Sequence, residues 1–272
     1  MKLIFLDIDG TLTEPGSNVP PDSALEAIRK TQEKGNLVFL CTGRNKAMLE
    51  PLLKYGFDGM VAAAGGYVTV KDKVLFDMPM PQEELEDLLS ILHKNGVFCT
   101  IEGKDRTYGD ENLSEFLKTA DGVNSEIERW RKALSESLNI YPMKEYNGGP
   151  IYKIVIMCEK KDQLREAQEK YEDRYDFVIQ EVAAHGNCAN GELINRAFDK
   201  GKGIRRIAEY LNVPIEDTYG FGDSMNDLTM IETVGTSVCM DNGAKALKKI
   251  SDLVVPSVTE DGLAAGFQQL GL

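Results

Sequence analysis

Two carboxylates near the N-terminus are the side chains of this sequence best suited to chemistry. Asp7 and Asp9 lie in the segment Asp7-Ile-Asp-Gly-Thr11, directly after the apolar run Leu3–Leu6, which predicts a short buried strand. Side chains two positions apart on a strand point the same way, so both carboxylates are expected at its carboxyl end. Because two like charges repel at this separation, they need a cation or a shared proton. The segment therefore favours a hard divalent cation beside one nucleophilic oxygen.

A second polar segment follows another apolar run. Thr42 and Gly43 come directly after Leu37–Cys41, a predicted strand. A hydroxyl and free backbone N–H groups at a strand end can donate to a phosphate oxygen. Taken alone, this pair indicates only a turn. Arg44 comes next and either helps to hold a phosphate, positions a cap domain, or forms a structural salt bridge.

A lysine stands at the start of a later predicted helix. Lys200 precedes an amphipathic stretch whose apolar face begins at Ile204. A lysine in this place opposes the helix dipole, so it is best explained by negative groups around it, such as carboxylates and a phosphate. Lys202 could take the same role. Lys200 is preferred, because Ile204 then falls on the first buried position of the helix.

The fourth segment is Gly222-Asp-Ser-Met-Asn-Asp227, which leads from a glycine-rich strand end into another helix. Ser224 is suited to cap that helix. Asp223 would complete the set of oxygen ligands around a metal ion. Asn226 and Asp227 can hydrogen-bond a metal-bound water or a phosphate.

Taken in order, these four segments resemble the signatures of the haloacid dehalogenase superfamily of phosphohydrolases. Segments 237–242, 252–255 and 260–263 resemble the tail of its Cof-type branch, which carries a large inserted α/β cap (type IIB). The resemblance covers the first ~80 and the last ~80 residues well and the middle loosely. It implies an α/β fold, with a Rossmann-like core around a mostly parallel sheet and a smaller inserted α/β cap domain.

The resemblance also implies roles for individual residues. Asp7 is the nucleophile that forms an aspartyl-phosphate. Asp9 is the general acid and base, and its backbone carbonyl is a Mg²⁺ ligand. The family places its lysine directly before a glycine, which again favours Lys200. The implied sites are, for catalysis, Asp7 and Asp9; for phosphate, Ile8, Thr42, Gly43, Lys200 and Asn226; for the metal, Asp7, Asp9 and Asp223, supported by Asp227.

Two segments depart from the pattern of the branch. Ala64-Gly65-Gly66 stands where relatives carry Asn-Gly-Ala, and Met240-Asp-Asn-Gly243 replaces Met-Gly-Asn-Ala. The second change places a further negative charge near the expected site. Both put the preference for the leaving group in doubt and leave the phosphoryl chemistry intact.

The spacing of the segments predicts the domain organisation. Far more residues separate Thr42 from Lys200 than one strand–helix unit needs. Pro79 and Pro81 mark a boundary between them, after which predicted helices and strands alternate. We expect a discontinuous core of residues 1–81 and 192–272 and an inserted cap of residues 82–191. In the cap we expect strands at 97–102, 153–157 and 177–182, and helices at 82–93, 113–119, 125–138 and 161–173.

Composition limits the class of partner. The net charge of −13 over 272 residues argues against a nucleic-acid binder. No stretch resembles a signal peptide or a membrane span. Five widely spaced cysteines favour a reducing cytoplasm over disulfides or a zinc site, and neither His93 nor His185 has metal-ligand spacing to a second histidine. We expect a cytoplasmic monomer or weak homodimer that acts on a small phosphorylated metabolite, such as a sugar phosphate.

Two other functions remain open at this stage. A phosphosugar mutase of the same superfamily would need basic residues that hold both ends of a bisphosphate. A receiver domain of a signalling protein also stores a phosphoryl group on an aspartate near Mg²⁺ but does not turn over. Receiver domains lack the acid two residues after that aspartate and are about half this length. Asp9 and the inserted segment therefore favour a phosphatase.

Overall fold

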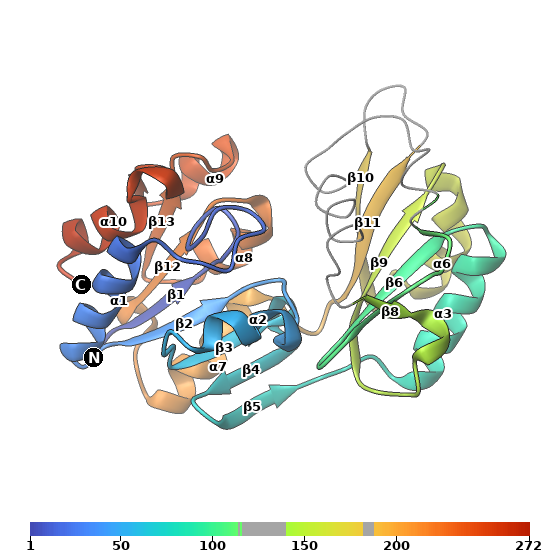
Figure 1. Cartoon of the computed structure of the whole chain (residues 1–272), viewed down its shortest axis with the longest axis horizontal. Coiled ribbons are helices and arrows are strands. Elements are labelled where there is room, and N and C mark those ends of the chain that lie inside the picture. The colour runs from blue at the N-terminus through green and yellow to red at the C-terminus, as the bar shows by residue number, and fades with distance from the viewer. Residues whose placement is uncertain (114, 116–139, 182–187) are drawn as a thin grey trace. The chain divides into compact units, whose positions relative to one another are not determined.

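The computed structural model describes residues 1–113, 115, 140–181 and 188–272. The chain divides into two compact units, which we describe one at a time. Unit 1 comprises Met1–Asp77 and Phe198–Leu272, and unit 2 comprises Met78–Ala197. In Figure 1 the chain leaves unit 1 after β5 and re-enters it before α7. Unit 1 is therefore built from two separate stretches of sequence.

An eight-stranded sheet forms the centre of unit 1, in the order β14-β13-β12-β1-β2-β3-β4-β5. The strands from β14 to β3 run parallel, and β4 and β5 add an antiparallel hairpin at one edge. The predicted mostly parallel core sheet is thus confirmed. The strands are β1 (Leu3–Leu6), β2 (Leu37–Cys41), β3 (Gly59–Ala62), β4 (Tyr67–Val70), β5 (Lys73–Asp77), β12 (Thr218–Gly222), β13 (Thr236–Met240) and β14 (Leu253–Val255).

Helices cover both faces of this sheet. On one face Leu3 and Phe5 pack with Ile204 of α7. On the other, Phe221 packs against Phe267 of α10 with ring centroids 5.2 Å apart, and α10 contacts α1 (Figure 1). Burial on both faces explains why the central strands read as unbroken apolar runs. The helices are α1 (Asp22–Glu33), α2 (Lys46–Leu53), α7 (Lys200–Leu211), α8 (Leu228–Ile231), α9 (Lys245–Ile250) and α10 (Gly262–Leu270).

The order of the strands reverses at β1, and this positions the polar segments. From β1 the chain proceeds outward through β2 and β3, and its later part returns to β12 on the opposite side of β1. Leu6 at the end of β1 pairs with Leu40 of β2 and with Phe221 of β12. Because all three strands are parallel, the segments that follow them meet at one edge of the sheet. Open α/β sheets bind their ligands at such a switch point.

Unit 2 has its own sheet and its own core. Its sheet has the order β10-β11-β9-β6-β7-β8, and Leu88 of α3 and Leu164 pack with Ile101 and Ile154 of the sheet. The prediction of a smaller α/β domain is confirmed. The elements are α3 (Gln82–Lys94), β6 (Phe98–Gly103), β7 (Thr107–Gly109), β8 (Ile140–Pro142), β9 (Ile151–Cys158), α6 (Arg165–Tyr171), β10 (Tyr175–Glu181) and β11 (Ala189–Asn195).

The boundary between the units differs from the one expected from the sequence. Residues 192–195, which the sequence analysis assigned to the core, belong to β11, which pairs with β9 and β10 in the sheet of unit 2. The expected re-entry at residue 192 is therefore wrong, because pairing with two neighbouring strands, and not the local sequence alone, defines β11. The helices expected at 113–119 and 125–138 lie outside the described residues, apart from residues 113 and 115.

Two further features bear on the class of protein. All five cysteines are buried, and none of them forms a disulfide. Among the helices that the structure describes, none is both long and apolar enough to cross a membrane.

Candidate active site

Lys200 lies at the centre of a group of polar side chains beyond the ends of β1 and β12. Its Nζ donates to Asp7 Oδ1 at 2.7 Å and to Asp227 Oδ1 at 2.5 Å. Nζ also lies 3.3 Å from Asn226 Oδ1. The Lys200 side chain is only 2% exposed. Burial alone would lower the pKa of Lys200, but the charges of Asp227 and Asp7 raise it above its usual value. The lysine is therefore a fixed positive charge.

The start of α7 explains why Lys200, and not Lys202, reaches this position. Asp199 caps the helix by accepting the backbone N–H of Lys202 at 2.7 Å. Lys202 is half-exposed, and its Nζ pairs with Asp199 Oδ2 at 3.4 Å. Gly65 has φ +104°, and a Cβ on it would lie 2.3 Å from the carbonyl oxygen of Asp199. This close approach of the loop after β3 fixes the N-terminus of α7.

Three carboxylates gather around the lysine. Ligating oxygens of Asp7, Asp223 and Asp227 lie within 4.8 Å of one another. Asp227 is fully buried, and its Oδ2 accepts the backbone N–H groups of Asp223 and Ser224 at 3.0 and 3.1 Å. Asp227 is thus held by both of its oxygens, one on these N–H groups and one on Lys200. Asp7 and Asp223 are the side chains better placed to bind a metal ion.

The electrostatics of this cluster also fit a cation. Burial and the repulsion of Asp227 raise the pKa of Asp7 well above its usual value. The same two causes raise the pKa of Asp223 to about 7. Carboxylates with raised pKa values lack sufficient positive charge nearby, which a divalent ion would supply. A set made only of oxygens suits a hard ion such as Mg²⁺ or Mn²⁺.

Gly10 allows the first carboxylate segment to approach Asp223. Its φ is +90°, and a Cβ on it would lie 2.5 Å from Asp223 Oδ2. Thr11 Oγ1 donates to Asp223 Oδ1 at 3.3 Å. Asn242 Nδ2 donates to the carbonyl oxygen of Gly10 at 2.8 Å, and Asn242 Oδ1 accepts the N–H of Val258 at 2.9 Å. Asn242, which was not among the site residues predicted from the sequence, thus holds the turn in place.

Asp9 lies outside this cluster. β1 ends at Leu6, and residues 7–13 form a compact turn in which the Leu12 N–H bonds the carbonyl of Ile8 at 3.0 Å. Asp7 and Asp9 therefore do not share a strand, and the expectation from strand period that they lie side by side is wrong. The Asp9 carboxylate accepts Arg44 Nε at 2.8 Å and Nη2 at 2.6 Å. Its Oδ1 also accepts the N–H of Gly16 at 2.8 Å.

Of the three alternatives left open for Arg44, the structure shows the salt bridge. The guanidinium holds both oxygens of Asp9, and its Nη1 donates to Asn18 at 2.7 Å. Only 10% of the Arg44 side chain is exposed. Arg44 ties the segment after β2 to the turn after β1, so it controls where the Asp9 carboxylate points.

The remaining predicted residues lie at the same edge of the sheet. Thr42 is buried, and its Oγ1 accepts the N–H of Arg44 at 3.2 Å. A Cβ on Gly43 would meet no atom within 4 Å, so the space around Gly43 does not itself require a glycine. The Ile8 side chain is fully buried, which leaves its backbone as the part that can touch a phosphate.

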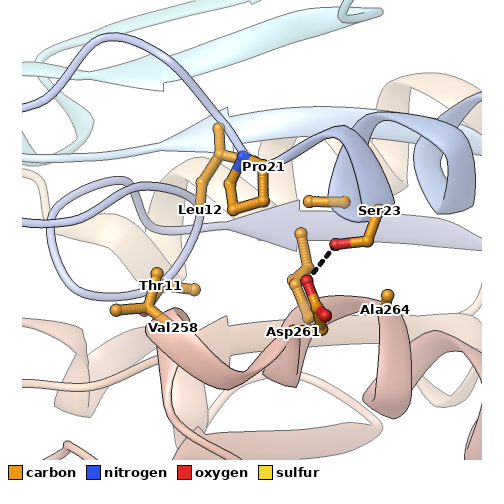
Figure 2. A pocket seen from close by; sticks show the side chains of 9 residues that line it. Thr11, Leu12, Pro21, Ser23, Val258, Asp261 and Ala264 are labelled. Atoms are coloured by element: carbon orange, nitrogen blue, oxygen red, sulfur yellow. Dashed lines mark hydrogen bonds between the residues drawn. The ribbon is translucent and has the colours of Figure 1, made fainter.

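A hollow near this edge does not belong to the candidate site. Figure 2 shows Leu12, Pro21 and Val258 around it, and Ser23 Oγ donating to Asp261 Oδ1 at 2.5 Å. None of the residues that line it is Asp7, Asp223 or Lys200. Its mainly apolar lining offers no cluster of charges for phosphoryl chemistry.

Comparison with known proteins agrees with this geometry. The family model of haloacid dehalogenase-like hydrolases matches residues 4–267. The chain is 30% identical to YkrA of Bacillus subtilis (strain 168), over 100% of this chain and 98% of that protein. It is 27% identical to the 5-amino-6-(5-phospho-D-ribitylamino)uracil phosphatase YwtE of the same organism, over 99% and 98%.

Solved structures show the same fold. The subclass IIB sugar phosphatase BT4131 superimposes with a TM-score of 0.77 at 23% sequence identity, over 100% of this chain and 99% of that one. The family resemblance noted from the four sequence segments is thus confirmed. The chain belongs to the haloacid dehalogenase-like hydrolase family.

Proposed function

We propose that the protein is a Mg²⁺-dependent phosphohydrolase that cleaves phosphate monoesters of small metabolites through an aspartyl-phosphate on Asp7. The observation that supports this most is the buried contact of Lys200 with Asp7 and Asp227, next to Asp223. It combines a carboxylate nucleophile, a fixed positive charge and a place for a metal ion. Phosphoryl transfer depends mainly on such positioning and charge stabilisation.

The residues divide the work as follows. Asp7 attacks phosphorus in line, which splits one difficult displacement into two easier ones. Lys200, the Thr42 hydroxyl, Asn226 and the backbone of Ile8 and Gly43 bind the phosphate oxygens. Asp7, Asp223 and the backbone carbonyl of Asp9 would hold Mg²⁺, which when bound neutralises charge on the transferring group. Asp227 orients Lys200 and the turn that carries Asp223.

Asp9 supplies the proton of the first step and removes one in the second. It protonates the leaving alkoxide, and then takes a proton from the water that attacks the aspartyl-phosphate. In the structure both of its oxygens accept N–H groups of Arg44. Protonation of Asp9 removes its negative charge and turns one of its oxygens into a hydroxyl, which is a weaker acceptor. Protonation of Asp9 therefore weakens its contact with Arg44.

The simplest experiment mixes the enzyme with Mg²⁺ and a panel of phosphate monoesters, such as sugar phosphates, pyridoxal phosphate and flavin mononucleotide, and measures free phosphate. Turnover of several substrates supports a phosphatase. Isomerised sugar phosphate without free phosphate would instead indicate a mutase. One phosphate per enzyme without turnover would indicate a phospho-acceptor domain.

Asp9→Asn is expected to slow turnover by ~10²–10⁴-fold, the range of general acid–base catalysis. The loss should be largest for alkyl phosphates, because an aryl leaving group departs without a proton. Asp7 and Asp223 remain, so the variant should still form some aspartyl-phosphate. The measurement is kcat for an aryl and an alkyl substrate, with Mg²⁺ affinity as the control. Wild-type rates on the alkyl substrate would assign the proton transfer to another group.

Mg²⁺ affinity is expected to rise with pH between about 6 and 8. The pKa of Asp223 is raised to about 7, so below pH 7 a proton occupies this carboxyl and competes with the metal. If one proton is displaced, the affinity should fall by up to about tenfold per pH unit below 7. Calorimetric titration in two buffers of different ionisation enthalpy measures both affinity and proton release. An affinity that is flat over this range would contradict the assignment of Asp223 as a ligand.

Unit 2 is proposed as the cap that selects the substrate. It has a separate core and is joined to unit 1 through two chain crossings. Replacing residues 78–197 by a short linker should broaden selectivity and favour small aryl phosphates, because contacts to the leaving group are lost while the phosphate site remains. The comparison is kcat/KM across the panel for the shortened and full chains, once both bind Mg²⁺. An unchanged ranking would place specificity in unit 1.

We also keep the cytoplasm as the proposed location and a monomer or weak homodimer as the proposed state. The five buried cysteines, none of which forms a disulfide, support a reducing compartment.

A further inference from the structure

Three side chains of unit 2 form a second cluster of metal-binding types. His93 comes from the last turn of α3, Cys99 from β6, and Asp110 directly follows β7. One ligating atom from each of these residues lies within 4.8 Å of the other two. Unlike the carboxylates around Lys200, this set combines sulfur, nitrogen and oxygen. Such a combination is typical of Zn²⁺ and related transition metals and does not suit Mg²⁺.

The fold already holds these three residues together. The backbone N–H of Asp110 donates to the carbonyl of Cys99 at 3.1 Å. In return Asp110 Oδ2 accepts the N–H of Cys99 at 2.7 Å. The same oxygen lies 3.0 Å from His93 Nε2. The carboxylate thus links the end of α3 to the β6–β7 hairpin, and the imidazole nitrogen faces the other two residues.

Solvent can reach this cluster from one side. His93 and Asp110 line a hollow of about 310 Å³ together with Gly96, Phe98 and Asn112. The His93 side chain is 40% exposed and that of Asp110 is 18% exposed, whereas Cys99 is fully buried behind them. A metal ion can therefore reach His93 and Asp110 through the hollow and keep a water on the open side, and the buried thiol of Cys99 lies within the same cluster.

We propose that His93, Cys99 and Asp110 form a second metal site in unit 2, with Zn²⁺ as the preferred ion and water as the fourth ligand. Zinc–ligand bonds of ~2.0–2.3 Å place neighbouring ligands of a tetrahedron about 3.3–3.8 Å apart. The ligating atoms of His93, Cys99 and Asp110 lie within 4.8 Å of one another, so a pair at that limit has to approach by about 1 Å to bind the metal. On binding, the S–H bond of Cys99 breaks, its proton leaves to water, and the sulfur electron pair forms the bond to the metal.

A metal ion has to displace protons from the metal-free cluster. Burial raises the pKa of the Cys99 thiol well above its usual value. The hydrogen bond to Asp110 raises the pKa of His93. The metal-free cluster is therefore a neutral thiol beside an imidazole–carboxylate pair, and metal binding releases protons from it to water. The site does not depend on the proposed phosphatase activity, and its role is to tie α3 to the hairpin.

Cobalt(II) titration of the full chain tests the proposal, because a thiolate bound to Co²⁺ gives an intense charge-transfer absorption that oxygen ligands do not. Co²⁺ can also bind the carboxylates around Lys200, so only the charge-transfer band of the thiolate is measured. Cys239 is the matched control, because it is buried and lies near the carboxylates around Lys200. Burial and the charge of Asp223 raise the pKa of its thiol. The wild type and Cys239→Ser should show the band, and one equivalent of Zn²⁺ should bleach it.

Cys99→Ser should lose the band, and His93→Gln should lose or strongly weaken it. His93 is partly exposed, so His93→Gln should fold even if the change at the buried Cys99 disturbs the unit, which circular dichroism would reveal. No thiolate band in the wild type would overturn the proposal. So would a band that survives Cys99→Ser, or one that is unchanged in His93→Gln.

Discussion

Asp7→Asn is expected to abolish phosphate release, with a loss of roughly 10⁴–10⁶-fold, the range observed when a catalytic nucleophile is removed. The amide has nearly the same shape and can still accept from Lys200, which now donates to Asp7 Oδ1 at 2.7 Å. Burial and the repulsion of Asp227 disfavour the charge on Asp7, so a neutral amide should not unfold the protein. The measurement is kcat with a good aryl phosphate, together with urea unfolding.

Asp72→Asn is the matched control for this variant. Asp72 is exposed in the turn between β4 and β5, so the same chemical change there should leave both activity and stability near the wild-type values. If pure, metal-replete Asp7→Asn turned over substrate at a substantial fraction of the wild-type rate, Asp7 would not be the nucleophile. A loss of activity accompanied by unfolding would instead mean that the charge of Asp7 is needed to hold Lys200.

The site residues that lie where the sequence predicted them are marked by their immediate neighbours along the chain. Asp7 and Thr42 directly follow apolar strands, and Asp223 follows a glycine-rich strand end. The parallel order of these strands brings their ends to one edge. Lys200 could be distinguished from Lys202 by two local signals, the position of Ile204 on the buried face of α7 and the glycine that directly follows Lys200. Strand ends and helix starts therefore predict the geometry of this edge well.

Features that depend on distant partners were not predicted. The contact of Asp9 with Arg44 joins residues 35 positions apart and requires the turn after β1 to close, which strand period does not describe. Residues 192–195 of β11 were assigned to the core, although β9 and β10 pair with this strand on both sides. His93, Cys99 and Asp110 are brought together by the packing of α3 on the β6–β7 hairpin, and no spacing rule contains that information.

Lys200→Met is expected to reduce both activity and stability. The lysine donates to Asp7 and Asp227, whose side chains are 5% and 0% exposed, so its removal leaves two buried carboxylates without their positive partner. Breaking a buried ion pair by removing one partner costs about 3–5 kcal/mol. Activity should fall by about 10²–10³-fold or more, as when one donor to a developing negative charge is lost. Urea unfolding and kcat measure the two effects, and Lys202→Met, at a half-exposed position, should change neither by much.

A double variant separates the structural role of Lys200 from its catalytic role. Asp227 accepts two backbone N–H groups through Oδ2, and an asparagine can keep these bonds through its amide oxygen while removing the negative charge that Lys200 balances. Lys200→Met/Asp227→Asn should therefore recover part of the lost stability but none of the activity, because the positive charge on the phosphate is still missing. Recovery of both would mean that Lys200 acts only by neutralising Asp227. If Lys200→Met alone kept wild-type stability and activity, the charge balance proposed for this site would be wrong.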